Sequence, residues 1–221
     1  MSAVQITVRG AFVAHRQPER GTVTVDVALQ SPSPTQVYAA VAESGQAVLA
    51  SITPLHSPDS GPVTWFSSGR VRTWAQRPWN QDGKQLPLVH HASQSITAKF
   101  SDFEELSKWL TAAVGITGVT VTNTEWTLTE KVRMELTRQV RAKAVQNARD
   151  KAQEYADALE LGPVRVIEIA DSGMLGEGLQ PETGQVVAYA RGMAADAGGG
   201  VQLVPEDVSV EASVDARFLI G

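Results

Sequence analysis

Residues 127–161 read TLTEKVRMELTRQVRAKAVQNARDKAQEYADALEL, and this stretch decides the fold because it predicts the longest helix in the chain. The segment Thr127-Leu128-Thr129-Glu130 has the spacing of a capping box, in which a Thr and a Glu three residues later satisfy each other's backbone N–H groups. Gly162 and Pro163 are typical of a helix end. A helix of about 30 residues, at ~1.5 Å per residue, is expected to cross a whole domain of this size.

One face of this helix is lined by small apolar residues. Alanine contributes little burial energy compared with the roughly 1.5–3 kcal/mol of a fully buried Leu, but it lets two backbones approach closely. We therefore predict that the helix lies flat on a sheet. The predicted contact residues fall within an arc of about 120°: Ala144, Val145, Ala148, Ala152, Tyr155, Ala156 and Leu159.

The first half of the helix differs in two ways. Val132, Leu136 and Val140 follow a four-residue step that drifts by about 40° each time, so this half is expected to bury a different face, against another element or a subunit. The span 131–151 is also basic, with seven Lys or Arg residues against two acidic ones. We interpret it as a solvated helix face, with a nucleic-acid or phosphate surface as the alternative.

The composition is that of a globular protein. The chain has 221 residues, of which 43% are hydrophobic and 19% charged, enough for one large or two small domains. Its net charge of −5 argues against general affinity for nucleic acid or anionic membranes, so such binding would have to be local. The absence of cysteine excludes disulfides and thiolate catalysis. No signal peptide or 18-residue apolar run is visible, which favours a cytoplasmic protein unless a leader has been removed.

Alternation of apolar and polar residues predicts strands on both sides of the long helix. Residues 4–10 and 22–29 alternate around a turn-like sequence at 17–21, which predicts an antiparallel hairpin. The other strands are expected as a pair within residues 63–100, and then at residues 119–128, 164–170 and 208–220.

Two shorter helices complete the expected fold. Ser33 before Pro34 predicts a helix to about residue 50, and Asp102 caps another helix that ends at Gly115. The element order is then ββαββαβαββ, an α+β fold of antiparallel sheets with one long helix, about 129–161, packed across them. We expect one domain over residues 1–221, with two subdomains at about 1–128 and 129–221 as a finer division.

A long glycine-rich loop is expected between the last two strands. Residues 171–205 carry eight of the eighteen glycines, and a loop of this length is usually functional or mobile. Gly173, Gly176 and Gly178 spell Gly-x-x-Gly-x-Gly, which is not the dinucleotide-binding fingerprint. We assign no cofactor to the chain.

Tryptophan and arginine alternate between residues 63 and 88, around a polar loop at 80–85. Aromatics of a sheet with guanidinium groups packed over them are the ordinary interpretation. The alternative is a protein that binds single-stranded nucleic acid or carbohydrate through Trp65, Trp74 and Trp79. Exposure of two of these indoles on one face would favour this alternative. The polar loop cannot cover its apolar flanks, so we expect a homo-oligomer contact here, with candidate residues Trp74, Arg77, Trp79 and Leu88.

The sequence contains no catalytic or metal-binding motif that we can assign. His90 and His91 are adjacent on a predicted strand, so they point to opposite faces and cannot both bind one metal without a bulge. No Gly-x-Ser-x-Gly, His-Glu-x-x-His or P-loop pattern occurs. An enzyme would need a site assembled by the fold, marked by a deep pocket with two titratable groups of opposed pKa shifts.

Three stretches resemble the SIMPL-domain family, a bacterial family of unknown function with periplasmic and stress-linked members. They are Val8-Arg9-Gly10 with the Pro18-Glu19-Arg20 turn, the helical run 144–159 with Gly162, and Pro205-Glu206-Asp207-Val208 before the last strand. The resemblance implies an α+β fold, no known catalytic residues, assembly into homo-oligomers, and roles in oxidative-stress defence and protein association. Unlike the periplasmic members, this chain shows no export signal.

The expected function is a non-enzymatic, self-associating binding or scaffold protein of this type. Its expected partners are further copies of itself or another protein, with nucleic acid and membranes not expected. The nucleic-acid or carbohydrate binder and the enzyme with a fold-assembled site remain the alternatives.

Overall fold

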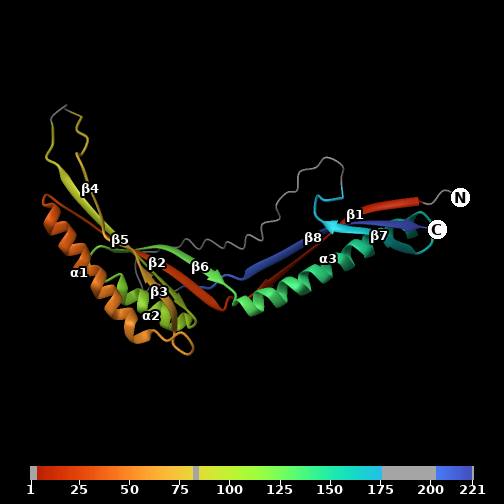
Figure 1. The fold of residues 1–221 in the computed structure, drawn as a ribbon, viewed down its shortest axis with the longest axis horizontal. Helices are drawn as coiled ribbons and strands as arrows, with labels where there is room; N and C mark the ends of the chain where they lie inside the picture. The colour runs from red at the N-terminus through yellow and green to blue at the C-terminus, as the bar shows by residue number, and fades with distance from the viewer. Residues whose placement is uncertain (1–3, 82–84, 176–202, 221) are drawn as a thin grey trace. The chain divides into compact units, whose positions relative to one another are not determined.

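The computed structural model describes residues 4–81, 85–175 and 203–220 (Figure 1). The elements follow the order ββαβββαβαββ, and all paired strands of the two sheets are antiparallel. This confirms the α+β class with antiparallel sheets. The region 63–100 contains three strands instead of the expected two. The chain divides into two compact units, which are described separately below.

The first unit, here called the α3 unit, contains the described parts of residues 1–17, 128–188 and 207–221. Its three-stranded sheet has the order β1-β8-β7, and helix α3 packs chiefly on β1 and β8. Figure 1 shows α3 running along one face of these strands. The bounds are Val4–Arg16 for β1, Val164–Asp171 for β7, Val208–Ile220 for β8 and Glu130–Ala158 for α3.

Helix α3 contacts its sheet through one row of residues four positions apart. Ala144, Ala148 and Ala152 are fully buried and form a core with Val8 of β1 and Phe218 of β8, among others. The predicted packing of the alanine face on a sheet is therefore confirmed. The row is continuous, and its buried members are Leu136, Val140, Ala144, Ala148, Ala152 and Ala156.

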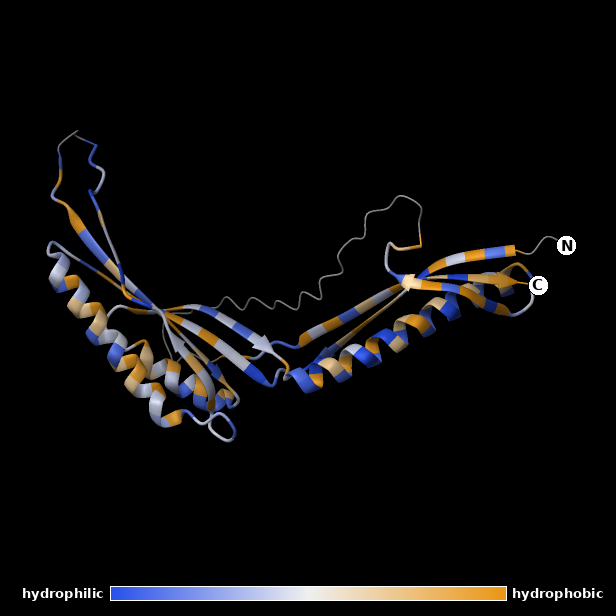
Figure 2. Ribbon diagram, in the orientation of Figure 1, coloured by the Kyte–Doolittle hydropathy of each residue, from blue (hydrophilic) through white to orange (hydrophobic). Residues whose placement is uncertain are grey.

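The predicted contact arc was too wide, because Val145, Tyr155 and Leu159 are exposed. Only the α3 residues spaced four positions apart stay in contact with the twisted sheet. The residues between them point to the flanks of the helix. On the flank towards β1, for example, Lys151 Nζ donates to the Arg9 carbonyl oxygen at 2.9 Å. Figure 2 shows hydrophobic and hydrophilic residues alternating along α3. The row drifts by about 40° at each step, so the first half of the helix buries a different side from the second half, as predicted. Among the described residues α3 contacts chiefly strands β1 and β8, so the expected packing of the first half on another element is not observed.

Both predicted ends of the long helix need correction. Thr127 ends strand β6, and Thr129 occupies the N-cap position without a capping hydrogen bond from its side chain. Glu130 forms an ion pair with Arg133 instead of a capping box. At the other end, Glu160 takes the left-handed conformation with φ of 55°, two residues before Gly162. The Leu161 N–H then closes the helix by donating to the Ala156 carbonyl oxygen.

The predicted hairpin at the N-terminus is wrong. Strand β1 pairs with β8 over its full length, from Val4 opposite Ile220 to Arg16 opposite Val208. The next strand, β2 (Arg20–Ser31), pairs with other strands on both of its sides. The connection between β1 and β2 contains no glycine or asparagine and no described residue with positive φ, which tight hairpin turns favour.

The second unit, here called the α1–α2 unit, contains residues 18–127 and the described part of 189–206. Its sheet has the order β3-β5-β2-β6, and β4 pairs with β5 beyond the end of β3. Helices α1 and α2 pack on one face of this sheet. The bounds are Pro34–Ile52 for α1, Val63–Ser68 for β3, Arg72–Gln76 for β4, Val89–Phe100 for β5, Phe103–Ala113 for α2 and Val119–Thr127 for β6; a 3-10 turn, Thr53–Leu55, follows α1.

The helices of this unit begin as the sequence predicts. The Ser33 side chain accepts a hydrogen bond from Gln36 N, and the Asp102 side chain accepts from Glu104 N and Glu105 N. Val23, Val25 and Val27 of β2 are fully buried and face the helices. The other face of the sheet carries the alternate residues, and no described helix packs on it.

The division into units departs from the sequence boundary at two places, of which one is that the described residues 203–206 belong to the α1–α2 unit. Strand β1 belongs with residues from 128 onward, whereas a cut at residue 128 assigned it to the first part. Its partner β8 lies at the other end of the chain, so no local pattern could indicate the pairing. Of the glycine-rich loop 171–205, residues 176–202 lie outside the described residues. No helix in the described part of the chain is long and apolar enough to cross a membrane.

Candidate binding surface

Strands β4 and β5 form a hairpin, joined by residues 77–88, and this hairpin carries all four candidate interaction residues. Every residue of β4 is exposed. Trp79 is 81% exposed, Trp74 is 48% exposed and Leu88 is 38% exposed. Arg77 is also exposed, and its Nη1 donates to the Leu86 carbonyl oxygen at 3.0 Å across the loop. The structure therefore places these residues on one projecting element of the α1–α2 unit.

Trp74 is held in place by the neighbouring strand. It pairs with His91 of β5, and the two rings are stacked with centroids 5.2 Å apart and planes 7° apart. Parallel offset stacking of this kind is a favourable arrangement of aromatic rings. One ring face of Trp74 contacts His91, and the exposed remainder is available to a partner.

A second indole lies on the same sheet face as Trp74. Trp65 of β3 is opposite Lys99 of β5, and Trp74 of β4 is opposite His91. Lys99 and His91 are eight positions apart on one regularly paired strand, so both point to the same side of the sheet. Trp65 is 48% exposed. Both indoles therefore lie on the sheet face opposite α1 and α2, here called the open face.

The sequence left open whether the indoles share a face, and it argues against it for Trp65 and Trp74, which are an odd number of residues apart. Strict alternation would put them on opposite sides. The edge strand is interrupted at residues 69–71, where five positions separate Ser67 from Arg72 but four separate their partners Thr97 and Ser93. The Gly69 N–H donates to the Ser95 carbonyl oxygen at 2.8 Å at this interruption. Gly69 was the signal in the sequence for such a break.

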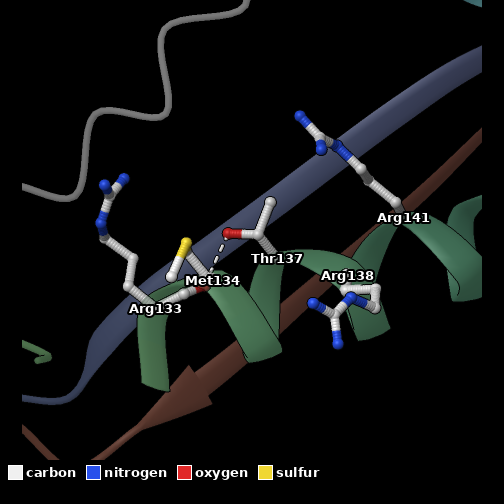
Figure 3. A pocket seen from close by; sticks show the side chains of 5 residues that line it. All are labelled: Arg133, Met134, Thr137, Arg138 and Arg141. Carbon is white, nitrogen blue, oxygen red and sulfur yellow. Dashed lines mark hydrogen bonds between the residues drawn. The ribbon is translucent and has the colours of Figure 1, made fainter. Parts of the chain in front are cut away.

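The basic stretch of α3 forms a shallow depression lined by Arg133, Met134, Thr137, Arg138 and Arg141 (Figure 3). Arg133 forms an ion pair with Glu130, and Arg138 forms one with Glu135. The Thr137 hydroxyl donates to the Arg133 carbonyl oxygen at 2.7 Å. Two of the three guanidinium groups are therefore neutralised locally, which agrees with a solvated helix face and does not indicate an anion site.

One carboxylate of the α3 unit has a lowered pKa. Asp215 of β8 is largely buried and forms hydrogen bonds with two groups of Arg9 on β1, Nε at 2.7 Å and Nη2 at 3.2 Å. This guanidinium holds the pKa of Asp215 below its usual value, and the Gly173 N–H, which donates to Oδ2 at 2.7 Å, acts in the same direction. Because Arg9 and Asp215 are cross-strand neighbours, we interpret the pair as structural.

The described residues contain no group of three or more side chains suited to holding a metal ion. His91 lies on the open face beside Trp74, whereas His90, one position earlier on β5, lies on the other face. The two histidines therefore point apart, as their adjacency predicted.

The sequence of the whole chain also matches a known family. A family model described as SIMPL, a protein of unknown function also designated DUF541, matches residues 6–218. No protein of curated function gives a significant match.

Proposed function

The chain belongs to the SIMPL family, whose function is unknown, and from this premise we propose that it is a non-enzymatic, self-associating binding or scaffold protein. The observation that carries the proposal is the 81% exposure of Trp79 on the β4–β5 hairpin. The resemblance to stress-linked members adds, as part of the same proposal, a role in a stress response.

The hairpin has the composition of an interface centre. A tryptophan contributes roughly 150–250 Å² of contact area when it is buried, and aromatic and arginine side chains are enriched where interfaces are most tightly packed. Trp79 and the free part of Trp74 together offer about 300 Å², against about 800 Å² per partner in a standard interface. The exposed Pro78, Pro87 and Leu88 extend the same apolar surface. This surface is large enough to form the centre of a contact between copies.

The charge of the hairpin favours a contact with a different surface of the neighbouring copy. Residues 63–100 contain five Lys or Arg residues and one acidic residue, in a chain of net charge −5. Two such segments facing each other would repel, whereas the segment and the acidic remainder of the next copy attract. A contact between unlike surfaces closes into a ring or continues as a filament. We therefore expect the assembly to weaken as salt is raised.

A binding role also agrees with the titratable groups of the described residues. The two resolved pKa shifts belong to Lys108 and Asp215, which lie in different units. The hydrogen bonds that Lys108 donates to the carboxylates of Glu105 and Glu104 raise its pKa on the surface of α2. A catalytic pair would instead need two such groups facing one pocket.

The experiment is Trp79→Ala, with mass measured by light scattering and thermal unfolding measured in parallel. The expected result is a lower mass with an unchanged unfolding temperature, because Trp79 supports no core. Tyr38→Ala on α1 is the matched control, since Tyr38 is also an exposed aromatic of the same unit. A monomeric wild-type chain would refute self-association. An unchanged mass with a large loss of stability would show that Trp79 belongs to a core.

A further inference from the structure

The open face of the α1–α2 unit carries a strip of side chains along strands β3, β4 and β5. The strip runs from Trp65, opposite Lys99, to Trp74, opposite His91. The two partners are eight residues apart on β5, which corresponds to about 27 Å at ~3.4 Å per residue. Residues between the two indoles are all polar on this face: Ser67 and Arg72 on the edge, and Ser93, Ser95 and Thr97 on β5. We call these side chains the Trp65–Trp74 strip.

The strip is more basic than the rest of the face. Arg72 is exposed between the two indoles, and Lys99 lies at the Trp65 end. The acidic residues of the open face, Asp26 of β2 and Glu125 of β6, belong to the inner and far strands of the sheet. Positive charge without acidic neighbours is thus found on the side of the face formed by β3, β4 and β5, whereas β2 and β6 carry one cation, Arg20, beside the two acidic residues. A local basic surface of this kind is what nucleic-acid binding by an acidic protein requires.

We propose that the Trp65–Trp74 strip binds single-stranded nucleic acid. Bases stack on the half-exposed indoles of Trp65 and Trp74, and the phosphates between them lie near Arg72 and Lys99. Hydroxyl groups of the serine and threonine residues hydrogen-bond to the sugar and phosphate groups. Surfaces that bind single strands without sequence preference combine these two features, an aromatic platform and a line of cations.

Charge and shape favour single-stranded nucleic acid over a neutral glycan or a nucleic-acid duplex. A neutral glycan could stack on the indoles but would not use the two cations, Arg72 near the Trp74 end and Lys99 at the Trp65 end. A duplex conceals the faces of its bases, so it cannot stack on two indoles of one flat face. The length of about 27 Å suits the ~4–16 nucleotides that comparable single-strand sites cover. The strip shares Trp74 with the proposed self-association surface but excludes Trp79, so Trp65→Ala and Trp79→Ala test the two surfaces separately.

The test measures binding of a fluorescently labelled oligo-dT of about 15 nucleotides by anisotropy, at several salt concentrations. Trp65→Ala and Trp74→Ala are each expected to weaken binding by about 5- to 150-fold, and Trp74→Phe by less, because a smaller ring still stacks. Arg72→Gln is expected to weaken binding and to reduce the slope of log affinity against log salt by about 0.7. Thermal unfolding of each variant confirms that it is folded.

Two controls locate the site. Tyr38→Ala, on the helix side of the sheet, is expected to leave binding unchanged. Trp79→Ala is expected to lower the mass of the assembly and to leave binding per chain unchanged. Loss of binding with Trp79→Ala and its retention with Trp65→Ala would assign the ligand to the hairpin loop and overturn the strip.

Competing ligands complete the test. A duplex of the same length is expected to bind more weakly than the single strand and to be insensitive to Trp65→Ala. Equal binding of single strand and duplex would overturn the proposal. Binding of a sulfated polysaccharide as tightly as the single strand, with the same dependence on Trp65 and Trp74, would also overturn the proposal. The site would then recognise acidic glycans. No binding of oligo-dT at low salt would also overturn it.

Discussion

Gly10 of β1 lies directly against Ala144 of α3, so that a side chain at position 10 would collide with the Ala144 carbonyl oxygen. A Cβ at this position would also be 2.5 Å from Ala148 N and 2.7 Å from Ala148 Cβ. The backbone of the helix therefore rests on the backbone of the strand. This contact requires a glycine on the strand and small residues on the helix row, and it explains why four alanines lie in that row.

Gly10→Ala is expected to destabilise the α3 unit by about 1–3 kcal/mol or more, because neither backbone can move away without disturbing the sheet or the helix. Urea unfolding measures the change. Gly162→Ala is the matched control, since nothing lies within 4 Å of its added Cβ and its φ is not positive. The free energy of unfolding of that variant should change by less than about 0.5 kcal/mol.

Ala148→Leu tests the same contact from the helix side. Ala148 is fully buried against the sheet, so three extra carbon atoms should overpack the interface and cost about 1–3 kcal/mol. Val145→Leu, on the exposed flank of the same turn, should be nearly neutral. Equal effects of the two changes in chemical denaturation would contradict the observed row.

Asp215 is expected to make the stability of the α3 unit depend on pH. Arg9 lowers the pKa of Asp215 in the folded state below the ordinary value of about 3.9. The carboxylate therefore contributes stability that is fully present above about pH 4–5 and is lost as the pH falls through the folded pKa. Urea midpoints measured from pH 7 down to pH 2 should fall more for the wild type than for Asp215→Asn. Arg9→Gln should reduce the same acid dependence, and an unchanged profile in both variants would contradict the assignment.

Ser51→Ala tests a polar contact in the core of the α1–α2 unit. Trp109 is buried in this core, and its Nε1 donates to Ser51 Oγ at 2.9 Å. Removal of the hydroxyl leaves the indole N–H without this acceptor, at an expected cost of about 1–3 kcal/mol. Ser107→Ala on the neighbouring helix is the control, because the Ser107 hydroxyl only donates within its own helix. Thermal unfolding should separate the two variants clearly.

The sequence by itself determined the local structure of this protein. The long helix, its alanine face, the caps at Ser33 and Asp102 and the α+β class all follow from patterns within a few residues. The start of the long helix was predicted wrongly, because Thr127 has the capping-box spacing to Glu130, and only the extent of strand β6 shows that the N-cap is Thr129. The candidate residues Trp74, Arg77, Trp79 and Leu88 could be found in advance because they are close together in one segment.

Only the tertiary structure decided which strands pair and which side chains share a face. Strand β1 pairs with β8, about 200 residues away, and no local pattern carries that information. Trp65 and Trp74 share the open face because the edge strand is interrupted between them, and one extra residue reverses the alternation of every side chain that follows. Residue types thus determine where the helices and strands form. Long-range strand pairing and the one-residue shift in the edge strand determine which side chains share a surface.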